Sequence, residues 1–478
     1  MCRAFKGPAL DVLWRNLPSI EPFVSCLPTH IWGFSLRGEL ILLKPIDTKA
    51  WATFDKYASR VRSITQTRDP TPIIEHLRIL MLSYPDPAST MFSNLRSLTW
   101  NDNQSHLAIE FLRVACVPSL IPLDLRITSF SPALISILST IGTTCPNLTS
   151  FRPQIDFPTL NSCYVPSLTQ AICQLHNLST LAVCELDDPG MEYVTQLKSL
   201  KTLWLHIAPR RKGSSPQSLG LEHLDCLVLQ GLRLNHITDF LCYLRTVQTK
   251  HFTTVFSGNA FGQQPDSMFE FCGMLLERCD NDTLETITLC EQFHNAFHSV
   301  SAQPSDFSPL RLFHNLTHVN VKAACIISIS DDELSELVEP WPKLKTFRLS
   351  YYHNPNSTLL PTFHGLINVL RRCPELVSLY LVVDTTQLDG IDVKSPGNGI
   401  RNDGLQELVL GNSPISSPLY VALVLSSLFP NLAEVNLAPW LSGLLRKFSS
   451  KVQVMEQWKS VNRLLGGFRT VRTRHLGP

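Results

Sequence analysis

The chain has 478 residues, of which 44% are hydrophobic and 17% charged, and its formal net charge is +1. This length allows two or three ordinary domains or one elongated repeat array, and the balanced charge gives no reason to expect a nucleic-acid or acidic partner. The 14 cysteines are too sparse for a disulfide scaffold.

The most apolar stretch, LYVALVLSSLF at 419–429, is too short to cross a bilayer, so no membrane association is expected. The first residues, MCRAFKGPALDVLWRNL, have neither the apolar core nor the cleavage site of a secretory signal. We therefore expect a cytoplasmic or nuclear protein whose thiols are reduced.

In chain order, residues 1–90 are expected to form a small helical region and a linker, and a Leu-x-x-Leu-x-Leu word then recurs through residues 91–440. The first-position leucines are Leu95, Leu120, Leu148, Leu178, Leu200, Leu224, Leu284, Leu316, Leu344, Leu376, Leu405 and Leu432. A weaker copy, HFTTVFS from residue 251, is interpreted with Phe252 in first position. The thirteen copies recur about every 28 residues, at the upper end of the leucine-rich-repeat period.

Each word is predicted to be a short strand, because its fourth and sixth residues, such as Leu203 and Leu205, would point to one face. Apolar residues three or four apart predict helices between the words. The clearest of these segments are 131–145, 267–279, 331–341 and 362–373.

One strand and one helix of this size cannot bury their apolar faces alone, so the copies should stack. The sequence therefore predicts an α/β fold, a curved leucine-rich-repeat solenoid with strands on the concave side and helices on the convex side. Unequal spacing indicates an irregular array, and Gly, Pro and Ser predict loops at 209–218 and 389–404. The alternative is an α/β domain whose strands resemble one another by chance.

The C-terminal segment, 441–478, is basic. Val454, Trp458, Val461 and Leu465 lie three or four residues apart, which predicts a helix that caps the last repeat. The final residues, FRTVRTRHLGP at 468–478, are expected to fray, with a membrane or nucleic-acid role as the less favoured interpretation.

Motifs typical of enzymes are absent: the sequence has no Gly-rich nucleotide loop, no His-Glu-x-x-His and no Gly-x-Ser-x-Gly. Cys272 and Cys279 are seven residues apart on a predicted helix, which favours core packing over metal binding. His314 and His318 fall at a strand entry, where their spacing does not give a shared face. We expect no catalysis, no metal and no cofactor.

The third, fifth and seventh residues of each word should face away from the core. Among them we predict the following residues to bind a protein partner: Arg126, Arg152, Trp204, His206, Lys322, Arg348 and Tyr380. Trp204 is the most informative, because a large aromatic at this position has no strand-packing role. The basic residues could bind an acidic segment or phosphate, or they could simply keep the surface hydrated.

Several segments resemble F-box/leucine-rich-repeat proteins, in particular the large fungal family. The shared features are CPNL at 145–148, CPEL at 373–376, ITDFL at 237–241 and CELDDPGMEYV at 184–194. Residues 2–17, with Phe5, Leu10, Leu13 and Trp14, resemble the closing helix of an F-box, and residues 26–64 resemble the linker of that family.

This resemblance implies a substrate-recognition subunit of an SCF-type ubiquitin ligase that binds its protein target on the concave face. Phe5, Leu10, Leu13 and Trp14 would be what remains of the adaptor-binding surface. Because the F-box is present only as its closing helix, docking on a Skp-type adaptor and cullin is expected if an upstream F-box exists. A monomer is expected. The alternative is a repeat scaffold or regulator with no connection to ubiquitin.

Overall fold

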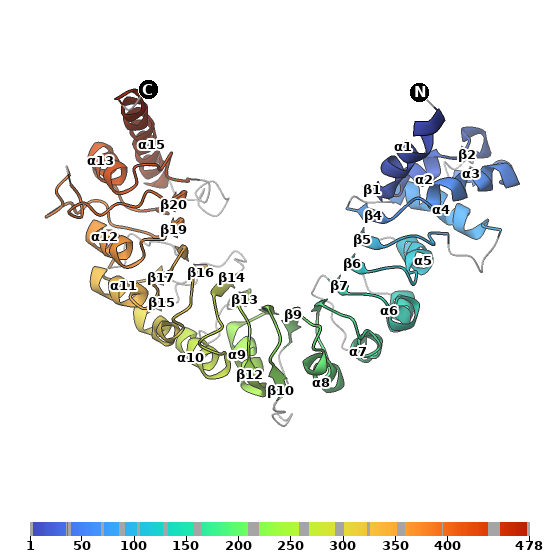
Figure 1. Ribbon diagram of the computed structural model, residues 1–478, viewed down its shortest axis with the longest axis horizontal. Helices are drawn as coiled ribbons and strands as arrows, with labels where there is room; N and C mark the ends of the chain where they lie inside the picture. The colour runs from blue at the N-terminus through green and yellow to red at the C-terminus, as the bar shows by residue number, and fades with distance from the viewer. Residues whose placement is uncertain are drawn as a thin grey trace. The chain divides into compact units, whose positions relative to one another are not determined.

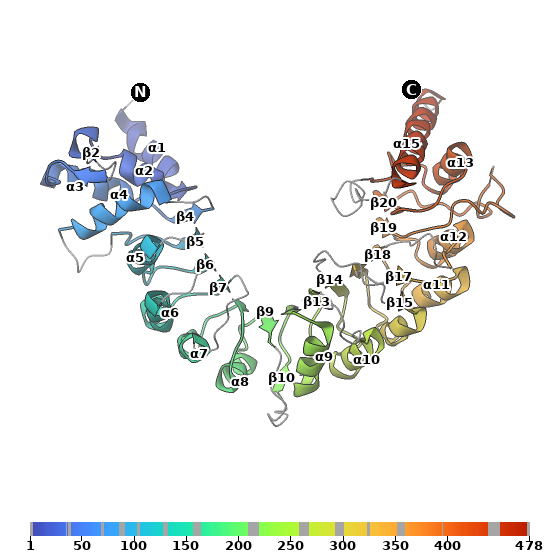
Figure 2. The same cartoon turned by 180° about the vertical axis from the view of Figure 1, so that it is seen from behind.

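The computed structural model describes residues 3–34, 36, 40–67, 71–85, 91–102, 106–127, 132–155, 164–208, 219–257, 267–291, 301–322, 326–350, 359–393, 395–437 and 450–475. Two compact units make up the chain, Met1–His206 and Ile207–Pro478. In both units, parallel strands alternate along the chain with helices (Figures 1 and 2).

The first unit has seven strands in a parallel ladder, in the order β1-β4-β5-β6-β7-β8-β9. They are β1 (Asn16–Leu17), β4 (Ser63–Gln66), β5 (Ser97–Asp102), β6 (Pro122–Ile127), β7 (Ser150–Ile155), β8 (Thr180–Val183) and β9 (Thr202–Ile207). The antiparallel pair β2 (Trp32–Phe34) and β3 (Leu40–Leu42) forms a separate hairpin. The helices are α1 (Arg3–Arg15), α2 (Glu21–Ser25), η1 (Thr29–Ile31), α3 (Thr48–Ala58), α4 (Thr71–Leu82), α5 (His106–Ala115), α6 (Pro132–Thr144), α7 (Val165–Ile172) and α8 (Asp188–Gln196).

The second unit has its ladder in the order β11-β13-β14-β16-β18-β19-β20. Its ladder strands are β11 (Cys226–Gly231), β13 (His251–Phe256), β14 (Thr286–Glu291), β16 (His318–Lys322), β18 (Thr346–Ser350), β19 (Ser378–Tyr380) and β20 (Glu407–Val409). Two small side sheets pair β10 (Leu219–Leu221) with β12 (Leu244–Val247) and β15 (Ser301–Ala302) with β17 (Ile326–Ile327). The helices are α9 (Leu234–Tyr243), α10 (Met268–Arg278), η3 (Pro304–Leu312), α11 (Asp331–Val338), α12 (Phe363–Arg372), α13 (Pro418–Leu428) and α15 (Ser450–His475).

The strand register confirms the predicted α/β leucine-rich-repeat solenoid. Fourth-position residues of successive words lie opposite one another, as Val319 does with Phe347 and Phe347 with Leu379. These side chains are buried, and in Figure 1 the helices α5–α8 lie on one side of the strands β5–β9. The core therefore fills the space between strands and helices, as the leucine spacing predicts.

The assignment of Phe252 to first position was wrong. The register pairs Phe252 with Leu227 and Ile287, which are fourth-position residues, so Thr249 occupies first position and Thr254 the sixth. Both threonines are buried in place of leucine. The cost of burying the Thr249 hydroxyl is offset by a hydrogen bond, because this hydroxyl donates to the carbonyl oxygen of Asp225 at 3.1 Å.

A repeat without a full leucine word precedes residue 91. Ile64 of β4 pairs with Leu98 of β5, so Val61, Ile64 and Gln66 fill the first, fourth and sixth positions. Gln66 is buried, and its side-chain oxygen accepts a hydrogen bond of 3.0 Å from the backbone N–H of Ile20. The ladder thus extends into the segment 1–90.

The four helices predicted most clearly are confirmed as α6, α10, α11 and α12. The motif at 237–241 lies inside α9, which starts at Leu234. The loop predicted at 209–218 lies outside the described residues, whereas the described residues of 389–404 form turns with neither helix nor strand.

Neighbouring repeats are joined by an asparagine directly before the first-position residue. The side-chain amides of these asparagines donate to a backbone carbonyl two residues before the first position of the preceding repeat. The pairs are Asn94 to Ser59, Asn147 to Pro118, Asn315 to Asp282 and Asn431 to Asp403, at 2.8–3.0 Å. This explains the Asn-Leu sequence in these words, because each bond satisfies a carbonyl where the chain turns into the strand.

Helix α15 packs on α13 and covers the end of the ladder (Figure 2). Trp458 is fully buried, and its indole N–H donates to the carbonyl of Ser413 at 3.0 Å. Asn462 bonds both the N–H and the C=O of Val435, each at 2.9 Å, and so satisfies backbone groups at the edge of the ladder. The predicted capping helix is therefore present.

The prediction that residues from 468 onward would fray was wrong as far as His475, because α15 continues to that residue. Arg472 gives a physical reason. Its guanidinium donates to the carbonyls of Pro430 and Ser426 near the C-terminal end of α13, at 2.8 and 3.2 Å. Cations are favourable at that end of a helix.

Candidate functional site

We call the strand surface turned away from the helices the open face. It consists of the third, fifth and seventh residues of each word, which alternate with buried core residues. In the second unit the fifth-position residues form a continuous row across the strands. This row consists of Val228, Thr253, Thr288, Asn320, Arg348 and Tyr380.

Trp204 lies on the open face of the first unit, at the fifth position of β9. Its side chain is 37% exposed, while Leu203 and Leu205 on either side are buried. Its partner in the register on β8 is Ala182, which is too small to cover an indole. The structure therefore places a large aromatic side chain on a surface where the strand needs none.

Two charged residues of the same face lie opposite each other, Asp124 on β6 and Arg152 on β7. Burial raises the pKa of the Asp124 carboxyl, and the nearby charge of Arg152 offsets part of that rise. Arg152 itself is exposed. The open face of the first unit thus combines an exposed aromatic with cationic and anionic groups.

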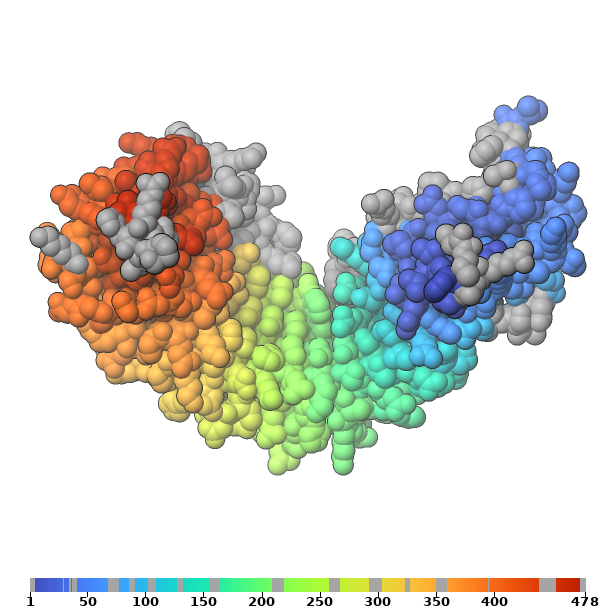
Figure 3. Space-filling model, turned by 45° about the horizontal axis from the view of Figure 1, so that its top comes forward, coloured from blue at the N-terminus to red at the C-terminus, as the bar shows by residue number. Residues whose placement is uncertain are grey.

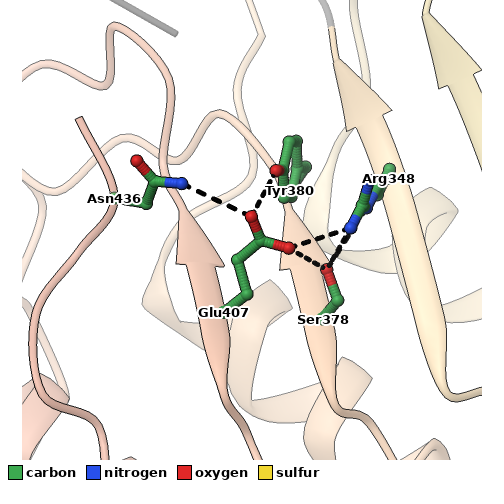
Figure 4. A network of polar contacts seen from close by, with 5 residues as sticks. All are labelled: Arg348, Ser378, Tyr380, Glu407 and Asn436. Atoms are coloured by element: carbon green, nitrogen blue, oxygen red, sulfur yellow. Dashed lines mark hydrogen bonds and ion pairs between the residues drawn. The ribbon is translucent and has the colours of Figure 1, made fainter. Parts of the chain in front are cut away.

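A polar network spans three neighbouring strands in the second unit (Figure 4). Glu407 accepts hydrogen bonds from Arg348 at 2.8 Å, Ser378 at 3.0 Å and Tyr380 at 2.6 Å, and Asn436 lies 3.4 Å away. The Arg348 guanidinium also lies over the Tyr380 ring, 4.4 Å from its centroid. Both Arg348 and Tyr380 are therefore held by residues of their own chain.

The protonation states of this network are well defined near neutral pH. Partial burial favours a higher pKa for Glu407, but hydrogen bonds from Tyr380 and Ser378 and the charge of Arg348 outweigh it, so its pKa lies below the ordinary value. Burial and the hydrogen bond to Glu407 raise the pKa of Tyr380 to about 12. Glu407 is thus an anion and Tyr380 a neutral donor, and the network braces the strands.

The residues predicted to bind a partner differ in accessibility. Arg126, Arg152 and Lys322 are exposed, as is Trp204. His206 is only 8% exposed, so a partner would reach little of its side chain. Arg348 and Tyr380 are half-buried in the network. Their binding roles stay predictions.

Sequence reasoning missed Glu407 and Ser378, which hold Arg348 and Tyr380 in place. Both are third-position residues, in register with each other on β20 and β19. Aligning all the words by position would have placed Glu407 one strand from Tyr380 and two from Arg348. Such an alignment is the sequence signal that could have identified Glu407 and Ser378 as neighbours of Arg348 and Tyr380.

The residues predicted to be an adaptor-binding remnant lie on α1, at the surface of the first unit (dark blue in Figure 3). Phe5 is 68% exposed and Leu13 70%, whereas Leu10 and Trp14 are half-buried. Trp14 stacks on Tyr57 of α3, with ring centroids 4.4 Å apart. Trp14 therefore anchors the helix while Phe5 and Leu13 face solvent.

Cys272 and Cys279 are buried, in agreement with the predicted packing role, and burial raises the pKa of the Cys279 thiol to about 12. Cys145 and Cys373 are also buried at helix ends. Within the described ranges, no group of three or more His, Cys, Asp or Glu residues could hold a metal ion. No helix within those ranges is long and apolar enough to cross a membrane.

Neither a protein-family model nor a curated protein sequence matches the chain. Among solved structures, the chain is similar to a leucine-rich-repeat-containing protein, LegL7, from Legionella pneumophila. The two share 12% sequence identity, the match covers 65% of this chain and 90% of that one, and the TM-score is 0.31.

Proposed function

We propose that this chain is a non-catalytic recognition subunit that binds a protein partner on the open face of its repeats. The observation that carries the proposal is the exposed indole of Trp204. Other fifth positions in the chain hold small residues such as Thr99, Ala182 and Thr253, so the strand fold itself does not require a large side chain there. Exposed Trp and Arg side chains are the residue types that most often dominate the affinity of protein interfaces.

Replacing Trp204 by alanine is expected to weaken partner binding by about 30-fold, which corresponds to about 2 kcal/mol for the loss of an interface anchor. The substitution should leave the fold intact, because the side chain is partly exposed already. The partner would first be identified by crosslinking it to the full chain in cells. Its affinity for wild type and for the variant would then be measured by calorimetry. The matched control is Phe269→Ala, which removes a 51% exposed aromatic from the helix side, on α10. Equal affinities for wild type and Trp204→Ala would contradict the proposal.

The more specific proposal is that the partner is a substrate delivered to an SCF-type ubiquitin ligase. Its support is the sequence resemblance together with the exposed apolar residues of α1, Phe5, Val12 and Leu13. Exposed apolar residues grouped on one helix are typical of a docking site for another protein. A scaffold or regulator unconnected with ubiquitin is the alternative.

The ligase proposal predicts copurification of a Skp-type adaptor and a cullin with the chain from its own cells. Phe5→Ser combined with Leu13→Ser should abolish that copurification, since both side chains would lie in the contact. The control is Val471→Ser, which alters an exposed apolar residue on α15. If the chain copurified with a partner bound to its open face but with no adaptor or cullin, the result would favour a function as a scaffold unconnected with ubiquitin.

A further inference from the structure

Cationic groups gather around His318 on the open face of the second unit. Burial lowers the pKa of this histidine, and the charges of Lys345, His251 and Arg348 lower it further, with Glu285 acting in the opposite direction. His251 lies on β13 and Arg348 on β18, Lys345 directly precedes β18, and the anion Glu285 directly precedes β14, around His318 on β16. Lys322, at the other end of β16, adds a further exposed cation.

The strand register sets these groups in order. His251, Thr286, His318 and Thr346 are successive third-position residues across four strands, and Lys345 directly precedes Thr346. His251 and Lys345 are exposed and His318 is half-buried. Within the described part of the chain, Lys345 takes part in no ion pair. Arg348 differs, because Glu407 already neutralises it.

His318 is held so that it can accept a second proton. Its Nδ1 lies 2.8 Å from the hydroxyl of Thr317, and that hydroxyl lies 3.2 Å from the carbonyl oxygen of Glu285. The hydroxyl can therefore accept from a protonated Nδ1–H while donating to the carbonyl. Among the described residues, Nε2 has no hydrogen-bond partner. Protonation thus leaves one N–H available to an external anion.

We propose that the row formed by His251, His318 and Lys345 binds an acidic, carboxylate-rich segment of the protein partner. The inference rests on the proposed function and specifies the chemistry of the partner. Separate carboxylates suit the row better than one phosphate does, because its side chains come from different positions along the ladder, where neighbouring strands lie about 5 Å apart. A phosphate site instead has several hydrogen-bond donors that converge on one point, above all arginine side chains that are not already in an ion pair.

This assignment gives the interaction a pH dependence whose direction follows from the geometry. Without ligand, burial and then the neighbouring cations hold the pKa of His318 below its usual value, and a bound carboxylate adds the opposite charge and raises that pKa. Binding therefore takes up a proton and should strengthen as the pH falls.

The test is fluorescence anisotropy of the full chain with a labelled peptide of alternating Glu and Gly at low ionic strength. Binding should be about fivefold tighter at pH 6 than at pH 7.5 and should weaken with added salt. Lys345→Ala should weaken it about threefold at both pH values. His318→Gln should remove the pH dependence. The control Arg371→Ala deletes an exposed cation on the helix side, in α12, and should change nothing.

Three outcomes would overturn the inference: no binding of the Glu peptide, equal binding of a Gln-Gly peptide, or equal effects of Arg371→Ala and Lys345→Ala. Tighter binding of a phosphoserine-Gly peptide at matched charge would show a phosphate site in place of a carboxylate site. Failure here would leave the proposed function standing if Trp204→Ala still reduced partner affinity, so the two results can be separated.

Discussion

Replacing Trp458 by alanine is expected to destabilise the C-terminal end of the second unit by about 3–5 kcal/mol, the range for deleting a fully buried large aromatic. The indole fills the contact between α13 and α15 and donates to the carbonyl of Ser413. Its loss would leave a cavity and also a buried carbonyl without its donor.

Because a repeat array does not unfold in one step, native-state hydrogen exchange is the appropriate measurement. Amides of α13, α15 and the last ladder strand β20 should lose protection, while those of β13 should change little. Val471→Ala, on the exposed side of the same helix, serves as the control. A Trp458→Ala variant with unchanged protection at β20 would show that α15 does not stabilise the end of the array.

Gly142→Ala is expected to destabilise the first unit by about 2 kcal/mol, although alanine favours helices. An added Cβ would lie 2.6 Å from the carbonyl oxygen of Ala171 and 2.6 Å from the side chain of Gln174. Helix propensity contributes a gain of about 1 kcal/mol, whereas overpacking against a backbone atom costs about 3 kcal/mol. The cost of overpacking exceeds the gain in helix propensity, because α6 and α7 must move apart to relieve the clash.

Gly273→Ala is the matched comparison. This glycine is inside α10, and an added Cβ there would meet nothing within 4 Å. The same substitution should stabilise α10 by about 1 kcal/mol. Hydrogen-exchange protection of α6–α7 and of α10 in the two variants should therefore change in opposite directions. Stabilisation by both substitutions would mean that α6 and α7 are not closely packed at Gly142.

The parts of the fold that follow from side-chain period could be predicted from the sequence. Leucine spacing gave the strands except at the last word, where residues 432–437 form neither helix nor strand. Apolar spacing gave helices such as α10 and α12. Copies in which polar residues replace leucine could not be aligned in this way. Because Thr249 and Thr254 stand where leucine is expected, Phe252 was assigned to the wrong position. Because Gln66 stands at a sixth position, the repeat that contains Val61 and Ile64 was not recognised. These polar residues are buried by their tertiary surroundings and not by their own hydrophobicity.

The candidate site was predictable only in part. The alternation of strand side chains correctly placed Trp204, Arg152 and Lys322 at the surface. It could not show that Arg348 is already neutralised, because its partner Glu407 is 59 residues away and meets it only through the register. The overall charge likewise gave no hint of the cations around His318, since a net charge near zero carries no information about local clusters.

If the open face is the recognition surface, site-specific photo-crosslinking should locate the partner on it. A photoreactive amino acid would replace, one at a time, Trp204, Arg152 and Lys322 on the open face and Phe269 and Arg371 on the helix side. We expect the three open-face positions to crosslink to the same partner in cells and the two helix-side positions not to. Crosslinks confined to the helix side would contradict it.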